Sequence, residues 1–208
     1  LSVTEDSLTT SFPGVLSAAD ADRDEVLHWS LASAPQNGAA NIAGTGSTPQ
    51  TFTYTPSADF AGEDAFEVRV EDAAGSTATI GIIVAVEPEN DPPSFTQGGP
   101  LRVTMSEDGA PIAWSAPALT ASDVDSGEAL TWSLAKGPVN GQATVAGSGL
   151  APSRFEYTPR RDYNGVDSFD VAVTDEEGSL ATLTVEVHIE PRNDAPVISE
   201  GDSLSVEG

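Results

Sequence analysis

Oxygen-bearing side chains crowd together along this chain in a pattern that suits a hard divalent cation. Residues 87–91 read Glu-Pro-Glu-Asn-Asp, so four of these five side chains carry a carboxylate or an amide oxygen. Asp123 and Asp125 form an Asp-Xaa-Asp step further along. Two carboxylates about 5 Å apart repel by roughly 3 kcal/mol at an effective dielectric near 20. Calcium would remove that repulsion, because it takes about six to eight oxygen ligands.

Other site chemistries find little support in the sequence. The chain has no cysteine and two histidines, so it offers no thiolate or imidazole cluster for zinc. Neither His28 nor His188 stands in a pattern that suggests a nucleophilic triad. Paired carboxylates could serve a glycosidase, but such an enzyme needs a cleft with aromatic side chains that stack on sugar. We therefore expect no catalytic activity.

The composition is strongly acidic, with 33 Asp and Glu against 8 Lys and Arg and a formal net charge of −25. This charge repels phosphate, so nucleic acid and anionic membranes are poor partners and cations are good ones. A solvated acidic surface that keeps the protein soluble is the alternative explanation. The 38% of hydrophobic residues, many in regular alternation, argue against disorder. No apolar run is long enough to cross a bilayer, and no signal peptide begins the sequence.

The chain contains two copies of one folding unit. A Leu-Xaa-Trp-Ser-Leu segment at residues 27–31 recurs at 130–134, and Tyr-Thr-Pro at 54–56 recurs at 157–159. A fixed register over most of each copy indicates a tandem repeat. We expect domains at residues 1–93 and 94–196, and in residues 197–208 the start of a third repeat or a tail.

Apolar and polar residues alternate with the period of β-strands, and turn residues separate the runs. Seven strands in each copy, with turns every ten or so residues, predict an all-β protein of two tandem seven-stranded Greek-key β-sandwiches. In the first copy, the predicted strands are residues 1–4, 14–18, 26–32, 39–42, 51–55, 65–71 and 77–86.

Most aromatic residues recur at the same strand position in both copies, which is typical of core rather than of a sugar platform. Trp114, which stands between Pro111 and Pro117, is the one expected to be partly exposed. Phe95 and Ile198 each follow a Pro-Xaa step after a linker, and we expect both to plug the open end of the sandwich that follows.

These motifs, in this order, resemble the cadherin-like repeats of bacterial surface and secreted proteins. The resemblance covers both copies. It rests on Asp-Xaa-Asp ahead of the tryptophan strand, Tyr-Thr-Pro followed by Asp-Phe-Xaa-Gly or Asp-Tyr-Xaa-Gly, an acid in the last hairpin, and an Asn-Asp-Xaa-Pro linker. It implies immunoglobulin- or cadherin-like sandwiches with calcium at the junction between repeats.

Carried over position by position, the resemblance implies three groups of metal ligands. The inner junction would use Glu5, Asp59, Glu87, Glu89, Asn90, Asp91, Asp123, Asp125 and Asp175. The outer half-site would use Glu107, Asp162, Glu190, Asn193 and Asp194. The N-terminal half-site would use Asp20, Asp22 and Asp72. Because Arg192 stands where the first linker has Glu89, we expect weaker binding at the outer site.

The function that the resemblance implies is an extracellular adhesive array, secreted or on the cell surface, whose repeat junctions are stiffened by calcium. Its partners would be other cadherin-like repeats or surface proteins, with neither nucleic-acid binding nor membrane insertion. One alternative is a calcium-dependent carbohydrate-binding module of a secreted polysaccharide-degrading protein, with polysaccharide as the partner. A passive spacer is the other alternative.

Overall fold

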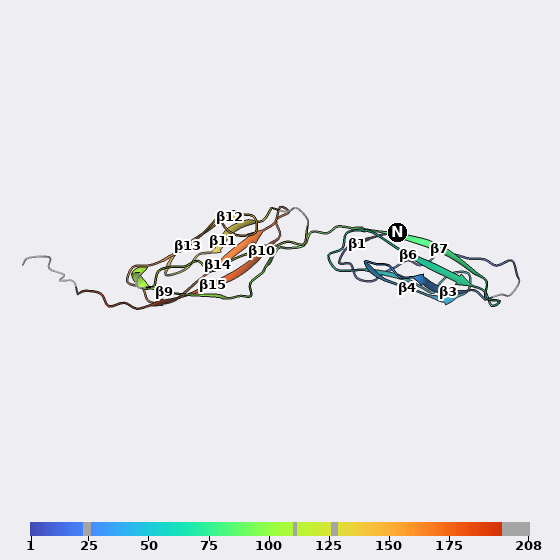
Figure 1. The fold of residues 1–208 in the computed structure, drawn as a ribbon, viewed down its shortest axis with the longest axis horizontal. Coiled ribbons are helices and arrows are strands. Elements are labelled where there is room, and N and C mark those ends of the chain that lie inside the picture. The colour runs from blue at the N-terminus through green and yellow to red at the C-terminus, as the bar shows by residue number, and fades with distance from the viewer. Residues whose placement is uncertain (23–25, 110–111, 126–128, 197–208) are drawn as a thin grey trace, which may run out of the picture. The chain divides into compact units, whose positions relative to one another are not determined.

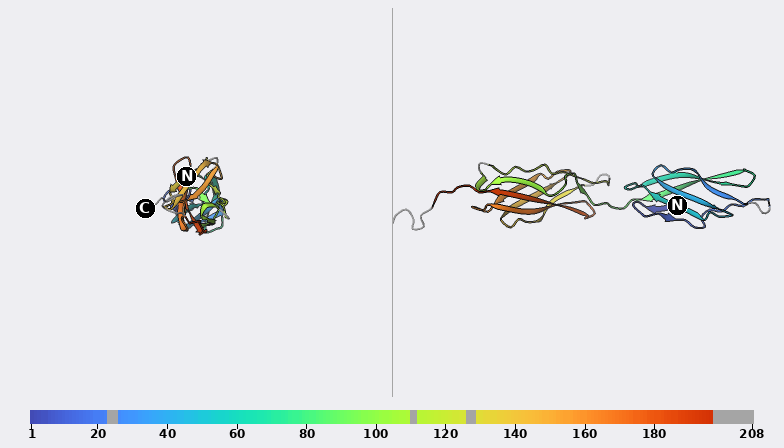
Figure 2. Two further views of the ribbon diagram at one scale, coloured as in Figure 1. Left: turned by 90° about the vertical axis from the view of Figure 1, so that its left-hand side faces the viewer. Right: turned by 90° about the horizontal axis from the view of Figure 1, so that it is seen from below.

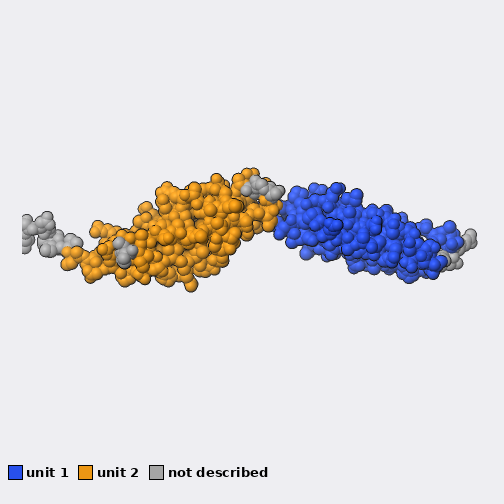
Figure 3. All heavy atoms as spheres, in the orientation of Figure 1, with its two compact units in different colours: residues 1–91 blue, residues 92–208 orange. Residues whose placement is uncertain are grey.

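The structure, a computed structural model, describes residues 1–22, 26–109, 112–125 and 129–196 (Figure 1). The chain divides into two compact units, Leu1–Asp91 (unit 1) and Pro92–Gly208 (unit 2) (Figure 3). The described residues form strands and one short 3-10 turn, with no α-helix among them. Within each unit the strands lie in two facing layers (Figure 2).

Unit 1 is a Greek-key sandwich in which β1 pairs in parallel with β7 and the other strand pairs are antiparallel. The order of hydrogen-bonded strands is β1-β7-β6-β3-β4-β5-β2. β3 and β4 pair at two positions only, so the ladder bends there into two layers. The strands are β1 (Ser2–Thr4), β2 (Thr10–Ser11), β3 (His28–Ser33), β4 (Gly38–Thr45), β5 (Thr51–Pro56), β6 (Gly62–Glu71) and β7 (Thr77–Glu87).

Unit 2 repeats this plan in the order β13-β12-β11-β14-β15-β9, and β8 and β10 form a separate antiparallel pair. The prediction of tandem all-β Greek-key sandwiches is therefore confirmed. The elements are β8 (Ser94–Phe95), β9 (Leu101–Ser106), η1 (Glu107–Gly109), β10 (Ala121–Ser122), β11 (Thr131–Lys136), β12 (Gly141–Ser148), β13 (Arg154–Pro159), β14 (Gly165–Thr174) and β15 (Leu180–Glu190).

One predicted strand of unit 1, residues 14–18, is wrong. The chain pairs with β5 earlier, at Thr10–Ser11, and then turns away at Pro13 and Gly14. Proline has no N–H for the ladder, and Gly14 has a φ of 74°, which is left-handed. Leu16 is nevertheless buried, so the alternation identified a core position although the segment makes no ladder.

The recurrent aromatic residues form the two cores, as predicted. Tyr54 stacks on Phe66 at 6.1 Å between ring centroids, and Tyr157 stacks on Phe169 at 5.7 Å. The indole N–H of Trp29 donates to the carbonyl of Gly46 at 2.9 Å, so this buried polar group is satisfied.

A buried carboxylate ties the turn before β4 to β6. The hydroxyl of Tyr54 donates to Asp64 Oδ2 at 2.8 Å, and the backbone N–H groups of Gln36, Asn37 and Ala65 donate to the same carboxylate. Burial by itself raises the pKa of Asp64. The four hydrogen bonds outweigh that effect, and the net pKa of Asp64 lies below its usual value.

We predict that Tyr54→Phe lowers the free energy of unfolding of unit 1 by about 1–2 kcal/mol, because a buried carboxylate loses one of its donors. The folded pKa of Asp64 is depressed, so its contribution is present above the unfolded pKa and is lost as pH falls through the folded value. The difference in unfolding free energy between the variant and the wild type should therefore be smaller at acidic pH. Denaturant titrations at neutral and acidic pH measure this.

Tyr163→Phe is the control, because the Tyr163 hydroxyl donates to an exposed carbonyl, that of Val166. We expect it to change stability by about 0.5 kcal/mol or less. Equal losses in the two variants would contradict a special role for the buried pair.

Candidate metal centre

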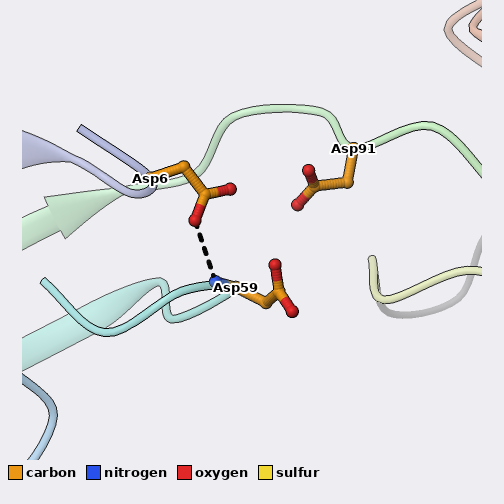
Figure 4. Close-up of side chains that lie close together, drawn as sticks. All are labelled: Asp6, Asp59 and Asp91. Atoms are coloured by element: carbon orange, nitrogen blue, oxygen red, sulfur yellow. Dashed lines mark hydrogen bonds between the residues drawn. The ribbon is translucent and has the colours of Figure 1, made fainter. Parts of the chain in front are cut away.

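Three aspartates from separate segments of unit 1 turn their carboxylates toward one another (Figure 4). Asp6 follows β1, Asp59 precedes β6, and Asp91 lies in the segment after β7. One carboxylate oxygen from each residue lies within 4.8 Å of those from the other two. The backbone N–H of Asp59 donates to Asp6 Oδ1 at 3.2 Å, which fixes the first two segments together. We call this group the unit 1 trio.

Unit 2 builds the same arrangement from its own residues. Asp108 lies in η1 after β9, Asp162 precedes β14, and Asp194 lies after β15. Their carboxylate oxygens also lie within 4.8 Å of one another, and all three residues are exposed. We call this group the unit 2 trio. The two trios occupy matching positions in the two repeats.

Two aspartates of each trio adopt a left-handed backbone conformation. Asp6 and Asp59 both have a φ of 56°, and Asp108 and Asp162 have φ values of 60° and 56°. For a residue with a side chain this conformation costs roughly 1 kcal/mol or more, although Asp and Asn tolerate it best. The same strained conformation at matching places in both units indicates that the direction of these side chains matters.

Like charges in the unit 2 trio contribute to a raised pKa of one of its members, Asp194. The pKa of Asp194 is raised, first by partial desolvation and then by the negative charges of Asp108, Asp162 and Glu107. The positive charge of Arg192 offsets part of this increase in the pKa of Asp194. Arg161 Nε lies 3.5 Å from Asp162 Oδ1. This electrostatic environment favours a cation.

A buried glutamate beside each trio holds the segment that carries the third aspartate. Glu5 is 3% exposed, and its Oε1 accepts the backbone N–H of Glu89 at 2.7 Å. Glu107 accepts the backbone N–H of Arg192 in the same way. Both glutamates are predicted ligands, and the structure shows that they also position the chain around the trio.

The remaining predicted ligands of the first linker lie close by but outside the trio. Glu87 Oε1 accepts the Ser2 hydroxyl at 3.4 Å, and the side-chain amide of Asn90 donates to the carbonyl of Asp91 at 3.3 Å. In unit 2, the amide of Asn193 makes the matching bond to Asp194, and Glu190 is exposed at the end of β15.

The predicted N-terminal half-site is partly assembled within unit 1. Asp20 and Asp72 line one cavity of about 300 Å³. Asp20 Oδ1 accepts the backbone N–H of Asp22 at 2.9 Å, and Asp72 Oδ1 accepts that of Ser76 at 2.8 Å. The backbone hydrogen bond from Ser76 is the largest cause of the lowered pKa of Asp72. The lowered pKa keeps Asp72 ionised at neutral pH, so a carboxylate faces this cavity.

The matching residues of unit 2 have the same local hydrogen bonds. Asp123 Oδ1 accepts the N–H of Asp125 at 3.0 Å, and Asp175 Oδ1 accepts the N–H groups of Gly178 and Ser179 at 2.6 and 2.7 Å. Their combination with the linker aspartate Asp91 in one inner site stays a prediction.

Sequence reasoning missed Asp6 and Asp108. The signal was present, because Glu5-Asp6 recurs as Glu107-Asp108. The resemblance implied a ligand role for the glutamate of each pair only. The left-handed turn after β1 and after β9 directs the neighbouring aspartate toward the site.

The chain belongs to the bacterial Ig domain family, whose model matches residues 1–85 and 90–188. These are thus tandem immunoglobulin-like sandwiches, and their arrangement of strands is also that of cadherin extracellular domains. Domains EC1–4 of Drosophila N-cadherin match at 15% identity with a TM-score of 0.56, over 92% of this chain and 48% of that one. Domains EC21–23 of human CDH23 match at 18% identity with a TM-score of 0.46, over 79% of this chain and 58% of that one.

At these identities the likeness to cadherins establishes the fold alone. The chain spans about half the length of the N-cadherin fragment that it matches. No curated protein sequence matches it. The described part of the chain includes no long apolar helix of the kind that spans a bilayer.

We predict that Asp194→Asn raises the thermal midpoint of the protein in chelator and lowers it in calcium. In chelator, the substitution removes one of three crowded charges. The folded pKa of Asp194 is raised, so its ionised form destabilises the fold at neutral pH, and this destabilisation is relieved as pH falls toward the raised pKa. In calcium, the same substitution removes a ligand. Differential scanning calorimetry with and without calcium measures both effects.

Glu67→Gln serves as the control, because it also removes one exposed carboxylate, from β6, but lies in neither trio. Relative to the wild type, the thermal midpoint of this variant should shift with the same sign in chelator and in calcium. A shift of the same sign for Asp194→Asn in both buffers would contradict a role of this aspartate in metal binding.

Proposed function

We propose that this protein is a calcium-binding array of extracellular immunoglobulin-like repeats in which calcium stiffens the linker between one repeat and the next. The observation that carries the proposal is the recurrence of the aspartate trio, with two left-handed aspartates in each copy. Such a repeated and strained placement of like charges is costly without a cation.

The ligand chemistry favours calcium over other metals. Every side chain in the trios offers carboxylate oxygen, which suits a hard ion and not zinc or copper. Calcium accepts irregular, many-oxygen coordination, whereas magnesium demands near-ideal octahedral geometry. In the proposal, the neighbouring Glu5 and Asn90, backbone carbonyls and water complete the shell around the unit 1 trio.

The origin of the ligands explains how an ion would act on the array. Asp6 and Asp59 belong to the body of unit 1, whereas Asp91 belongs to the segment that leaves it. An ion bound to all three pins that segment to the sandwich. Its removal leaves three carboxylates that repel one another, and the segment gains freedom. Oxygens from Asp123, Asp125 and Asp175 of the next repeat would extend the same clamp across the junction.

The energy scale suits such a role. At a hundredfold excess over its dissociation constant, a ligand stabilises the bound state by about 2.7 kcal/mol. Each unit has its own buried core, so calcium need not fold it and instead restrains the linker.

We further propose a secreted or cell-surface location and an adhesive role without catalysis. The net charge of −25 suits calcium-rich surroundings and disfavours nucleic acid and anionic membranes. The partners would be repeats of the same kind or other surface proteins. Membership of the bacterial Ig domain family supports a modular binding or spacing role.

We predict that isothermal titration calorimetry detects calcium binding with dissociation constants of about 10⁻⁴–10⁻³ M, the range of extracellular modules. Asp6→Asn and Asp108→Asn should each weaken one site by about tenfold or more, because each removes a charged ligand. Asparagine tolerates the left-handed backbone, so both variants keep their fold.

Glu67→Gln should leave every binding constant unchanged. Absence of binding heat at millimolar calcium, or equal constants in all the variants, would overturn the calcium proposal.

A cavity in unit 2 gives a specific reason to keep carbohydrate as a second candidate ligand. It has a volume of about 400 Å³ and is lined by Trp114, Tyr157, Arg160 and Asp108 among others. Trp114 is partly buried, as expected, and packs against Tyr157 at 5.7 Å between ring centroids. Because Asp108 belongs to the unit 2 trio, calcium held there would lie beside the cavity.

We predict that, if this cavity binds sugar, the protein is retained on insoluble polysaccharide in calcium and released by chelator. Arg160→Ser, which installs the residue found at the matching position of unit 1, would then reduce retention, whereas Arg102→Ser at another exposed arginine would not. Lack of retention in calcium would leave the structural array as the function. If calcium binding were also absent, the passive spacer would be favoured.

A further inference from the structure

The cavity of about 400 Å³ in unit 2 combines aromatic side chains with positive charge. Trp114 and Tyr157 line it together with Arg160 and Arg161. Its volume lies within the range of about 300–1,000 Å³ that is usual for small-molecule sites. The whole chain has 8 Lys and Arg against 33 Asp and Glu, so two arginines beside one cavity are a local exception to an acidic composition.

Both arginines are available to a ligand. Arg160 is exposed, and among the described residues no carboxylate forms an ion pair with it. Arg161 Nε lies 3.5 Å from Asp162 Oδ1, but both side chains are largely exposed, and such surface pairs contribute little. The backbone of Arg160 is fixed, because its N–H donates to the carbonyl of Asn140 at 2.7 Å and its carbonyl accepts the N–H of Tyr163 at 3.1 Å.

The cavity borders the edge of β13 that matches the position of β2 in unit 1. There, β2 pairs with β5, with Thr10 opposite Tyr54. Within the described part of unit 2, no strand pairs with this edge of β13. Instead, the indole N–H of Trp114 donates to the carbonyl of Phe155 at 3.3 Å. The edge beside Tyr157 therefore offers backbone polar groups to a ligand.

A second cavity extends the site along β13. It has a volume of about 360 Å³ and is lined by Gly141, Gln142, Thr158, Pro159 and Arg160. The last three of these residues also line the first cavity. The two cavities therefore adjoin at Arg160, and an extended ligand can occupy both.

One member of the unit 2 trio also lines the first cavity. Asp108 borders it, and the carboxylate oxygens of Asp108, Asp162 and Asp194 lie within 4.8 Å of one another. These three charges repel an anionic ligand. With calcium bound, the positive charge of the ion and the two arginines exceeds the negative charge of the trio. Charges further away matter less, because salt screens them over about 8 Å at physiological ionic strength.

Unit 1 has a trio but lacks the arginines. Ser57 and Ala58 stand at the positions of Arg160 and Arg161, and Phe12 stands at the position of Trp114. Unit 1 therefore serves as a control within the same chain for what the trio does without the cavity of unit 2.

We propose that the cavity of unit 2 binds an acidic saccharide, whose uronic-acid carboxylate is bound jointly by Arg160 and by calcium in the unit 2 trio. The planar guanidinium group matches a carboxylate in geometry, and carboxylate oxygen is a ligand that calcium prefers. Trp114 and the edge of β13 contact the sugar ring. The inference rests on the calcium site of the proposed function, to which it adds the charge of the saccharide and the unit that binds it.

Isothermal titration calorimetry of the full chain with a short oligogalacturonide in calcium tests the proposal. The fully methyl-esterified oligomer is the matched control, because it has the same rings without the charge. We expect the acidic oligomer to bind at one site per chain and the ester to bind about tenfold or more weakly. In chelator the acidic oligomer should lose about tenfold or more in affinity. By linkage, the acidic oligomer should strengthen calcium binding at one site by the same factor.

Variants separate the cavity from the calcium sites. Arg160→Ser should weaken binding of the acidic oligomer by about tenfold or more and leave calcium binding without sugar intact, whereas Arg102→Ser, at an exposed arginine outside the cavity, should change neither. Asp108→Asn should weaken binding of the acidic oligomer in calcium. Asp6→Asn, in the trio of unit 1, should leave it unchanged.

Two kinds of failure are distinguishable. A chain that binds calcium but not the acidic oligomer, or that binds acid and ester equally, would overturn the acidic-saccharide proposal alone. Equal losses of sugar binding in Asp6→Asn and Asp108→Asn would do the same, because the site would then not belong to unit 2. Absence of calcium binding without sugar would overturn the proposed function, and this inference with it.

Discussion

Repulsion among three carboxylates is the constraint on which the functional interpretation of both units depends. In each unit the sandwich supplies two aspartates and the departing segment supplies the third, all within 4.8 Å. A buried glutamate holds that segment by a backbone hydrogen bond, so the charges cannot simply move apart. A bound cation would turn the repulsion into attraction. The same feature that strains the free protein would then make the linker respond to calcium.

The two units share a plan but differ in places that bear on binding. Both have an aspartate trio, a buried Tyr-Asp pair and a buried tryptophan. In unit 2, β8 also pairs with β10 and places Phe95 against Trp132. Trp114 and Arg160 give unit 2 a cavity beside its trio, where unit 1 has Phe12 and Ser57. The two units therefore share a scaffold but present different surfaces to a partner.

Much of the fold was predictable because alternation and repetition are local signals. Six of the seven predicted strands of unit 1 overlap observed ones, and the paired aromatic residues are core. The error at residues 14–18 has a physical cause, since burial and hydrogen-bonded pairing usually coincide but separate where Pro13 and Gly14 turn the chain. Leu16 still packs into the core there, so its pattern suggested a strand that does not form.

The sequence by itself determined the repeat, the all-β sandwich and the acidic oxygen chemistry, including Asp59, Asp91, Asp162 and Asp194. Tertiary structure decided which oxygens meet. Asp6 and Asp108 enter the trios because a left-handed turn reverses their side chains relative to the preceding glutamates, and no pattern of residue types encodes that direction. It also decided that Phe95 of β8 packs against Trp132 of β11, since this contact joins segments that lie far apart in the sequence. The alternation of apolar and polar residues can be predicted from the sequence because it is local. Which side chains meet depends on how segments far apart in the sequence pack together.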